Sequence, residues 1–183
     1  MRADFIARRK GSLSLPITGA LLYSLAALLS LWVPKAQHNL LLTICFWAIL
    51  PVGAMITKLR GELPSNPANP LFRLSAIGRV LALSTWAIHI PVWIYAPDLF
   101  PLTVGICFAL HWTIFSWTLG HPVGFIHLAM RIIFVLLACH YFPANRMGAV
   151  SAGIALAYVI SVVQLSRIDW AGRLGRPLTP LPA

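Results

Sequence analysis

Four ionisable side chains placed well inside long apolar segments are the residues of this sequence that could do chemistry: His89, His111, His127 and Arg131. An ionisable group is costly in the hydrocarbon of a membrane, so it is expected to face protein, water or a ligand. Arginine offers a fixed positive charge and a planar set of N–H donors. Histidine can donate or accept a hydrogen bond, or take up a proton. These residue types predict a polar site for an anion.

The spacing of three of these residues places them near one another. Arg131 lies about eight residues into one apolar segment, roughly 12 Å deep at a rise of about 1.5 Å per residue. His111 lies about as far from the end of the preceding segment, and the tight turn at 120–124 joins the two as antiparallel neighbours. His127 is one helical turn from Arg131 on the same face. We therefore expect one pocket that contains Arg131, His111, His127 and the hydroxyl of Ser116.

Two structural alternatives compete with this interpretation. The long Arg131 side chain could extend along its helix to the head groups, and a neutral histidine could simply bond a carbonyl of a neighbouring helix. His89 lies in the preceding apolar segment, one turn after Thr85, and Tyr158 is a further hydrogen-bonding candidate. The predicted ligand-binding residues are Arg131, His111, His127, His89, Ser116 and Trp112.

Covalent and metal chemistry have no support in the sequence. Only four acidic residues are present, none at membrane depth, so the carboxylate usual in proton-coupled transport is missing, although histidine could titrate instead. His89 and His111 differ in depth by several residues, which disfavours a haem held between them. Zinc-protease spacing, a nucleophile elbow and a phosphate-binding glycine loop are absent. We predict no cofactor, no metal and no catalytic residue, and Cys45, Cys107 and Cys139 are expected to be small apolar side chains.

The elements that position these residues are predicted to be membrane-spanning helices. The chain has 183 residues, of which 59% are hydrophobic and 10% charged, whereas about 25% are charged in a typical soluble domain. A helix needs about 20 apolar residues to span a bilayer. We predict an all-α, polytopic integral membrane protein, a single membrane domain over residues 1–183, with six spans at about 15–33, 40–57, 75–95, 100–119, 123–142 and 147–165.

The charge pattern orients these spans. The net charge is +10, and basic residues collect in cytoplasmic loops, so we expect both termini in the cytoplasm. Lys35 and Arg146 fall outside, and no nucleic-acid motif accompanies the basic residues. The first span lacks a cleavage site, so it is expected to be retained. The cytoplasmic set is Arg2, Arg8, Arg9, Lys10, Lys58, Arg60, Arg73, Arg79, Arg167, Arg173 and Arg176.

The tails and the last span suggest partners. Membrane lipids are expected against both basic tails, and the first ten residues are either an ordinary basic flank or a short surface helix on anionic lipid. A stripe of small residues allows close approach of another helix, from the same chain or from a homo- or hetero-oligomer. This stripe consists of Ala149, Gly153, Ala157 and Ser161. Pro51 near Gly53 predicts a kink in the second span.

Short strings in the central half of the chain carry a resemblance. They are Asn-Pro-Leu at 69–71, Leu-His-Trp at 110–112 and Ser-Trp at 116–117. With them the segment from Asn66 onward resembles a family of small bacterial inner-membrane proteins that has no assigned function. The resemblance implies a compact six-helix protein in the bacterial cytoplasmic membrane and draws attention to His111 and Trp117.

The function that these observations favour is binding or passage of a small or lipid-like, anionic molecule in an intramembrane pocket. One alternative is an accessory membrane subunit without a ligand of its own, which the small-residue stripe and the lack of chemical motifs favour. The other alternative is a membrane enzyme that acts on lipid head groups through His111.

Overall fold

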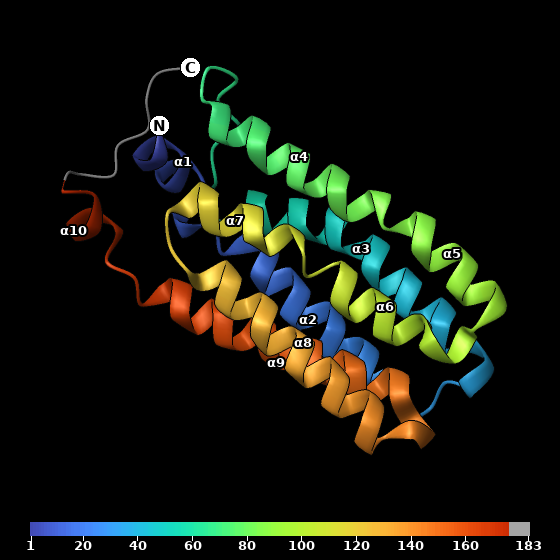
Figure 1. Cartoon of the computed structure of the whole chain (residues 1–183). Coiled ribbons are helices and arrows are strands. Elements are labelled where there is room, and N and C mark those ends of the chain that lie inside the picture. Colours follow the sequence, from blue (N-terminus) through green and yellow to red (C-terminus); the bar gives the residue numbers. More distant parts are fainter. Residues whose placement is uncertain (176–183) are drawn as a thin grey trace.

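The chain folds into a bundle of helices. The computed structural model describes residues 1–175, and within that range no strand occurs (Figure 1). Arg176, counted above among the cytoplasmic basic residues, lies outside the described residues. The α-helices are α1 Arg2–Arg8, α2 Ser14–Leu29, α3 His38–Leu59, α4 Pro70–Ser84, α5 Trp86–Tyr95, α6 Phe100–Cys107, α7 His111–Leu119, α8 Val123–Tyr141, α9 Arg146–Ser166 and α10 Trp170–Leu174. Short 3-10 turns are η1 Lys10–Ser12, η2 Lys35–Gln37, η3 Pro97–Leu99 and η4 Pro143–Asn145.

Six helical stretches are long and apolar enough to cross a membrane. The prediction of an all-α protein with six such helices is therefore confirmed, and these are the features of a multi-pass membrane protein. The first stretch begins earlier than the sequence suggested because the turn η1 continues into α2. The stretches are Lys10–Leu29, Lys35–Leu59, Pro70–Tyr95, Pro97–Leu119, Val123–Tyr141 and Pro143–Ser166.

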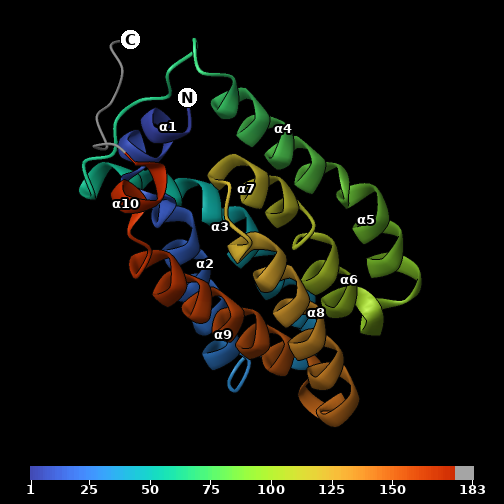
Figure 2. The ribbon, with the colours of Figure 1, turned by 60° about the vertical axis from the view of Figure 1, so that its left-hand side comes forward.

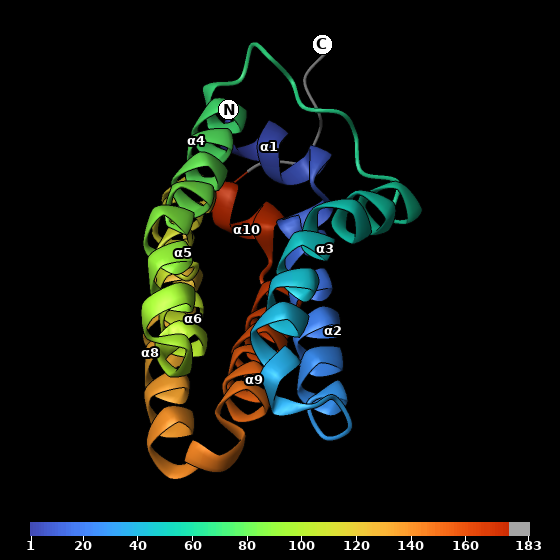
Figure 3. The same ribbon diagram turned by 90° about the vertical axis from the view of Figure 1, so that its right-hand side faces the viewer.

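Helix α9 is central to the packing, since it lies against both α2 and α8 (Figure 2). Helix α3 packs on α2, α6 packs on α8, and α4 packs on α7. A view turned by 90° shows α4, α5, α6 and α8 on one side of the bundle and α2 and α3 on the other (Figure 3). This arrangement brings the inner faces of α2, α6, α8 and α9 together.

The third and fourth spans are each interrupted, at places that were not predicted from the residue types. Thr85 separates α4 from α5, and residues 108–110 separate α6 from α7. In the second interruption the Ala109 N–H donates to the Ile106 carbonyl at 2.9 Å, three residues back instead of four. The predicted kink at Pro51 takes a milder form: α3 continues through this proline and bends in its second half (Figure 3).

The N-terminal helix α1 is part of the protein core at one end of the bundle, and its Ile6 side chain is completely buried. The carboxylate of Asp4 accepts hydrogen bonds from Arg8 Nε at 2.9 Å and from Asn69 Nδ2 at 2.7 Å. Asn69 also caps α4 by accepting from the Leu71 N–H at 3.1 Å, as residues at this position commonly do. The first helix is therefore bonded to the start of the third span, an arrangement that neither sequence interpretation of the tail included.

Close packing of α7 on α8 gives a first test. At Gly124 an added Cβ would collide with the main-chain carbonyl oxygen of Trp112, which cannot move aside. We expect Gly124→Ala to lower the free energy of unfolding by about 1–3 kcal/mol, the usual cost of overpacking. Gly78→Ala is the matched control, because its Cβ would lie at an ordinary 3.4 Å from Ile114 Cγ2 and alanine is the better helix former. Thermal unfolding in detergent measures both, and equal losses would contradict this packing.

Candidate functional site

Arg131 occupies the interior of the bundle. The side chain is fully buried, and its guanidinium donates from Nε to the Gly105 carbonyl at 2.7 Å and from Nη1 to the Tyr158 hydroxyl at 3.4 Å. Its Cζ lies 5.5 Å from the ring centroid of Tyr23 and 5.6 Å from that of Tyr158, a cation–π arrangement worth about 0.5–2 kcal/mol for each ring. The side chain does not extend to the head groups, so the first structural alternative does not describe it.

The interruption of the fourth span supplies the acceptor for Arg131. In an unbroken helix the Gly105 carbonyl would accept the N–H of Ala109, four residues on. Here Ala109 donates to Ile106 instead, at 2.9 Å, which leaves the Gly105 carbonyl for the guanidinium. Gly105 also has to be a glycine, since an added Cβ would lie 2.8 Å from Val135 Cγ2 of α8. The break between α6 and α7, together with the glycine at position 105, allows α6 to approach Arg131.

His127 lies one turn before Arg131. Its Nδ1 lies 2.9 Å from the Ser161 hydroxyl, which is also 2.9 Å from the Ala157 carbonyl. In the tautomer that donates from Nδ1–H to Ser161, the neutral imidazole carries its lone pair on Nε2. The ring stacks on Trp112, with centroids 3.6 Å apart and 13° between the planes.

Several buried polar atoms in this region have no hydrogen-bond partner among residues 1–175. A buried N–H without a partner costs about 1–3 kcal/mol, so such atoms are rare unless they serve a purpose. The cluster is close enough for the charge of Arg131 to act on both histidines. The atoms are Arg131 Nη2, His127 Nε2, Trp112 Nε1 and His111 Nδ1.

Two of the predicted ligand-binding residues lie elsewhere. His89 is fully buried in α5, and each ring nitrogen lies within hydrogen-bonding distance of a hydroxyl: Nε2 is 3.1 Å from that of Thr85 and Nδ1 is 3.2 Å from that of Thr103. Ser116 accepts a hydrogen bond from the Phe125 N–H at 3.0 Å, where α7 turns into α8. Both residues therefore hold helices together at a distance from the arginine. Arg131, His127 and Trp112 are brought together, and His111 borders them, its ring centroid 6.3 Å from that of Trp112.

Sequence reasoning missed two residues of this site. Tyr23 stacks on Tyr158 with ring centroids 5.9 Å apart and places its face toward the guanidinium. A tyrosine in the middle of the first span was a usable signal for it. Gly105 contributes a main-chain carbonyl, which no residue type could have indicated.

The small-residue stripe of α9 faces α8 of the same chain. An added Cβ on Gly153 would lie 3.1 Å from Phe134 Cβ, and Ser161 bonds His127. Both contacts require close approach of the two helices, which small side chains permit. Use of this stripe between protomers remains a prediction.

In the described part of the chain, no group of three or more His, Cys, Asp or Glu side chains is placed to hold a metal ion.

The fold and the buried cation define the class: a helical, six-span membrane protein with a polar cluster inside its bundle. The chain belongs to the DUF7010 family, a family of unknown function, which matches it over residues 1–167. The match extends well beyond the central half that carried the resemblance in the sequence. Neither the curated proteins nor the solved structures contain a match to this chain.

The surroundings of Arg131 predict how substitutions affect stability. Arg131→Met removes the charge while filling a similar space, and the Gly105 carbonyl can regain the Ala109 N–H. Because no acidic partner is left unpaired, we expect a folded protein with a thermal midpoint within a few degrees of the wild type. Arg131→Lys keeps the charge but loses the planar donors, so we expect it to lower the free energy of unfolding by about 1–3 kcal/mol. Thermal unfolding in detergent compares the two, and the reverse order would show that the charge is needed for folding.

Proposed function

We propose that the protein binds a small anion inside the bundle, on the N–H groups of Arg131 and Trp112. The observation that carries the proposal is a fully buried arginine whose Nη2 has no partner among the described residues. Of the four acidic residues of the chain, Asp4, Glu62 and Asp169 lie outside the six spans, and Asp98 is the second residue of the fourth span, in the turn at its end. An anion would supply the missing negative charge. Its charged oxygen would also be the strongest kind of hydrogen-bond acceptor for a guanidinium.

The chemical class of the anion follows from His127. In the tautomer that we propose, with the ring hydrogen on Nδ1 toward Ser161, the neutral ring offers a lone pair on Nε2. An oxyanion that retains an O–H can donate to this nitrogen, whereas a fully deprotonated oxyanion places an oxygen lone pair against the nitrogen lone pair. The ligand we propose is therefore an oxyanion with a single negative charge and at least one O–H, of the dihydrogen phosphate or bicarbonate type.

The proposed setting is the bacterial cytoplasmic membrane, with both termini in the cytoplasm. Helix α1, helix α10 and the loop between α3 and α4 lie at the same end of the bundle (Figure 1). Together with the chain directly beside them, these segments carry seven of the fourteen Lys and Arg residues: Arg2, Arg8, Arg9, Lys10, Lys58, Arg60 and Arg173. Basic residues on one side of the membrane are what the positive-inside rule expects of the cytoplasmic face. Passage of the anion across the membrane is an extension of this proposal, which uptake by proteoliposomes would test.

Anion binding predicts a stabilisation that depends on Arg131. Inorganic phosphate added at constant ionic strength should raise the thermal midpoint of the wild type in detergent, by the equivalent of about 2.7 kcal/mol at one hundred times Kd. Arg131→Met should lose this response while remaining folded. Arg73→Met is the control, because Arg73 is an exposed arginine near the start of α4. Equal responses of the two variants would refute the proposed site.

The imidazole predicts selectivity between two anions of similar shape. Phosphate keeps an O–H near neutral pH and sulfate does not, so the wild type should bind phosphate about tenfold or more tightly, as expected when a buried acceptor is left unpaired. Ser161→Ala frees the ring to place its hydrogen on Nε2, and we expect the preference to shrink. Titration calorimetry with both anions measures the ratio. If Ser161→Ala keeps the same preference for phosphate, then the hydrogen-bonding state of His127 does not determine the selectivity.

A further inference from the structure

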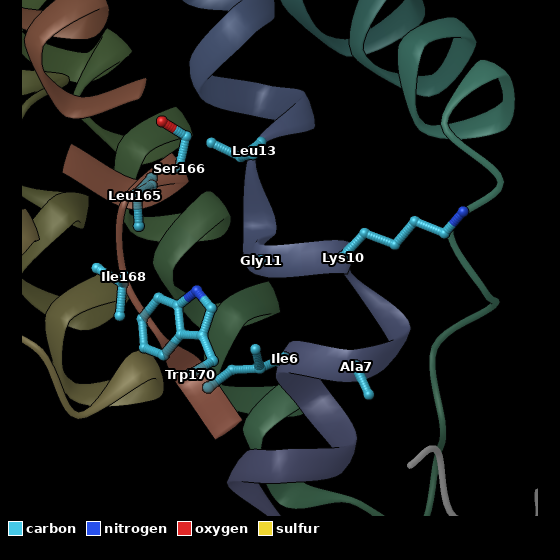
Figure 4. A pocket seen from close by; sticks show the side chains of 9 residues that line it. All are labelled: Ile6, Ala7, Lys10, Gly11, Leu13, Leu165, Ser166, Ile168 and Trp170. Atoms are coloured by element: carbon cyan, nitrogen blue, oxygen red, sulfur yellow. The ribbon is translucent and has the colours of Figure 1, made fainter. Parts of the chain in front are cut away.

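A pocket of about 300 Å³ lies at the end of the bundle where α1 and η1 meet the end of α9 (Figure 4). Its walls are mainly apolar, with Ile6 and Leu13 on one side and Leu165 and Ile168 on the other. The indole of Trp170 lies between these walls (Figure 4). The pocket is separate from the Arg131 cluster.

The indole of Trp170 provides an N–H donor at this pocket. The side chain is 8% exposed, and its Nε1 has no hydrogen-bond partner in the described range. Gly11 faces this nitrogen, and an added Cβ would lie 3.5 Å from it. The missing side chain at Gly11 therefore leaves space over the N–H.

The backbone beside the pocket adopts an unfavourable conformation. Lys10, Gly11 and Ser12 have φ values of 43°, 77° and 60°, a left-handed region that costs free energy for residues other than glycine. Arg60 Nη2 holds this turn by donating to the Lys10 carbonyl at 2.9 Å. Strain of this kind persists where the surrounding structure fixes it, and it is concentrated at binding sites.

The charge around the pocket is positive. Lys10 lines the pocket, and Arg167 lies in the sequence between two residues that line it. Arg173 follows on α10. None of these three basic residues has an ion pair among the described residues. Burial and the nearby Arg173 lower the pKa of His121, whose ring packs 5.9 Å from that of Trp170, so this imidazole adds no charge at neutral pH. The acid Asp169 is occupied in capping α10 through the Gly172 N–H at 3.0 Å.

We propose that this pocket binds one anionic phospholipid, with an ester or phosphate oxygen on Trp170 Nε1 and the upper acyl chain along the apolar walls. The pocket lies where the spans of α2 and α9 end, which is the depth of the glycerol and head-group region. Tryptophan is enriched at that depth because its ring is apolar and its N–H is polar. Basic pockets at helix ends are suited to acidic head groups.

The test is native mass spectrometry of protein stripped of lipid, after addition of phosphatidylglycerol or phosphatidylcholine with the same acyl chains. The wild type should retain one phosphatidylglycerol under activation that removes phosphatidylcholine. Trp170→Phe keeps an aromatic ring and removes the donor, so retention should weaken about tenfold or more, the loss expected for one hydrogen bond to a charged group. Trp117→Phe, at an exposed tryptophan of α7, should behave as the wild type.

A second variant covers the case in which Trp170→Phe fails to fold. Ala7 lines the pocket, and its side chain has no hydrogen-bonding group. A phenylalanine at this position, in Ala7→Phe, should therefore fill the space and abolish lipid retention. Equal retention of the two lipids, or lipid retention unaffected by Ala7→Phe, would overturn the proposal. Displacement of phosphatidylglycerol by equimolar inorganic phosphate would also overturn it, since the pocket would then recognise free phosphate and not a lipid.

Discussion

The hydrogen bond between Arg131 and the Gly105 carbonyl is the constraint on which the interior of this protein depends. A buried guanidinium needs acceptors, and insertion of arginine at the centre of a membrane helix costs at least about 2.5–3.5 kcal/mol. The chain meets this need with a main-chain carbonyl and two aromatic faces. That solution requires a break between α6 and α7, a glycine where α6 meets α8, and stacked tyrosines from α2 and α9. Four of the six spans are thus arranged around one side chain.

The few acidic residues explain why this arginine lacks a carboxylate. Asp4 is committed to Arg8 and Asn69. Glu62 lies within 4 Å of the guanidinium groups of Arg9 and Arg60 and accepts from Ser14. Both carboxylates hold the N-terminal segment against the loop that enters the third span. The acidic residues therefore stabilise the basic end of the bundle, and the interior keeps an uncompensated positive charge. An interior site of that kind selects anions by its electrostatics alone.

The number and type of the helices could be predicted from the sequence because the bilayer imposes length and hydropathy on each span. The neighbourhood of Arg131 and His127 was also accessible, since both lie on one helix face and a tight turn fixes the adjacent span. The contacts of His89 with Thr85 and Thr103 were less accessible, because depth along a helix does not show the direction in which a side chain points. The break at residues 108–110 contains no proline and no glycine, so the residue types there could not predict it. The carbonyl ligand and the folded N-terminal helix depend in the same way on contacts between distant segments.

The two proposed sites share helix α9. Ser161, which fixes the imidazole of His127, lies four residues before Leu165, which lines the lipid pocket. That separation is one helical turn, about 6 Å along the axis. The close packing of α9 on α8 therefore positions residues of both proposed sites: it sets Ser161 beside His127, and it fixes where Leu165 and the end of the helix meet η1.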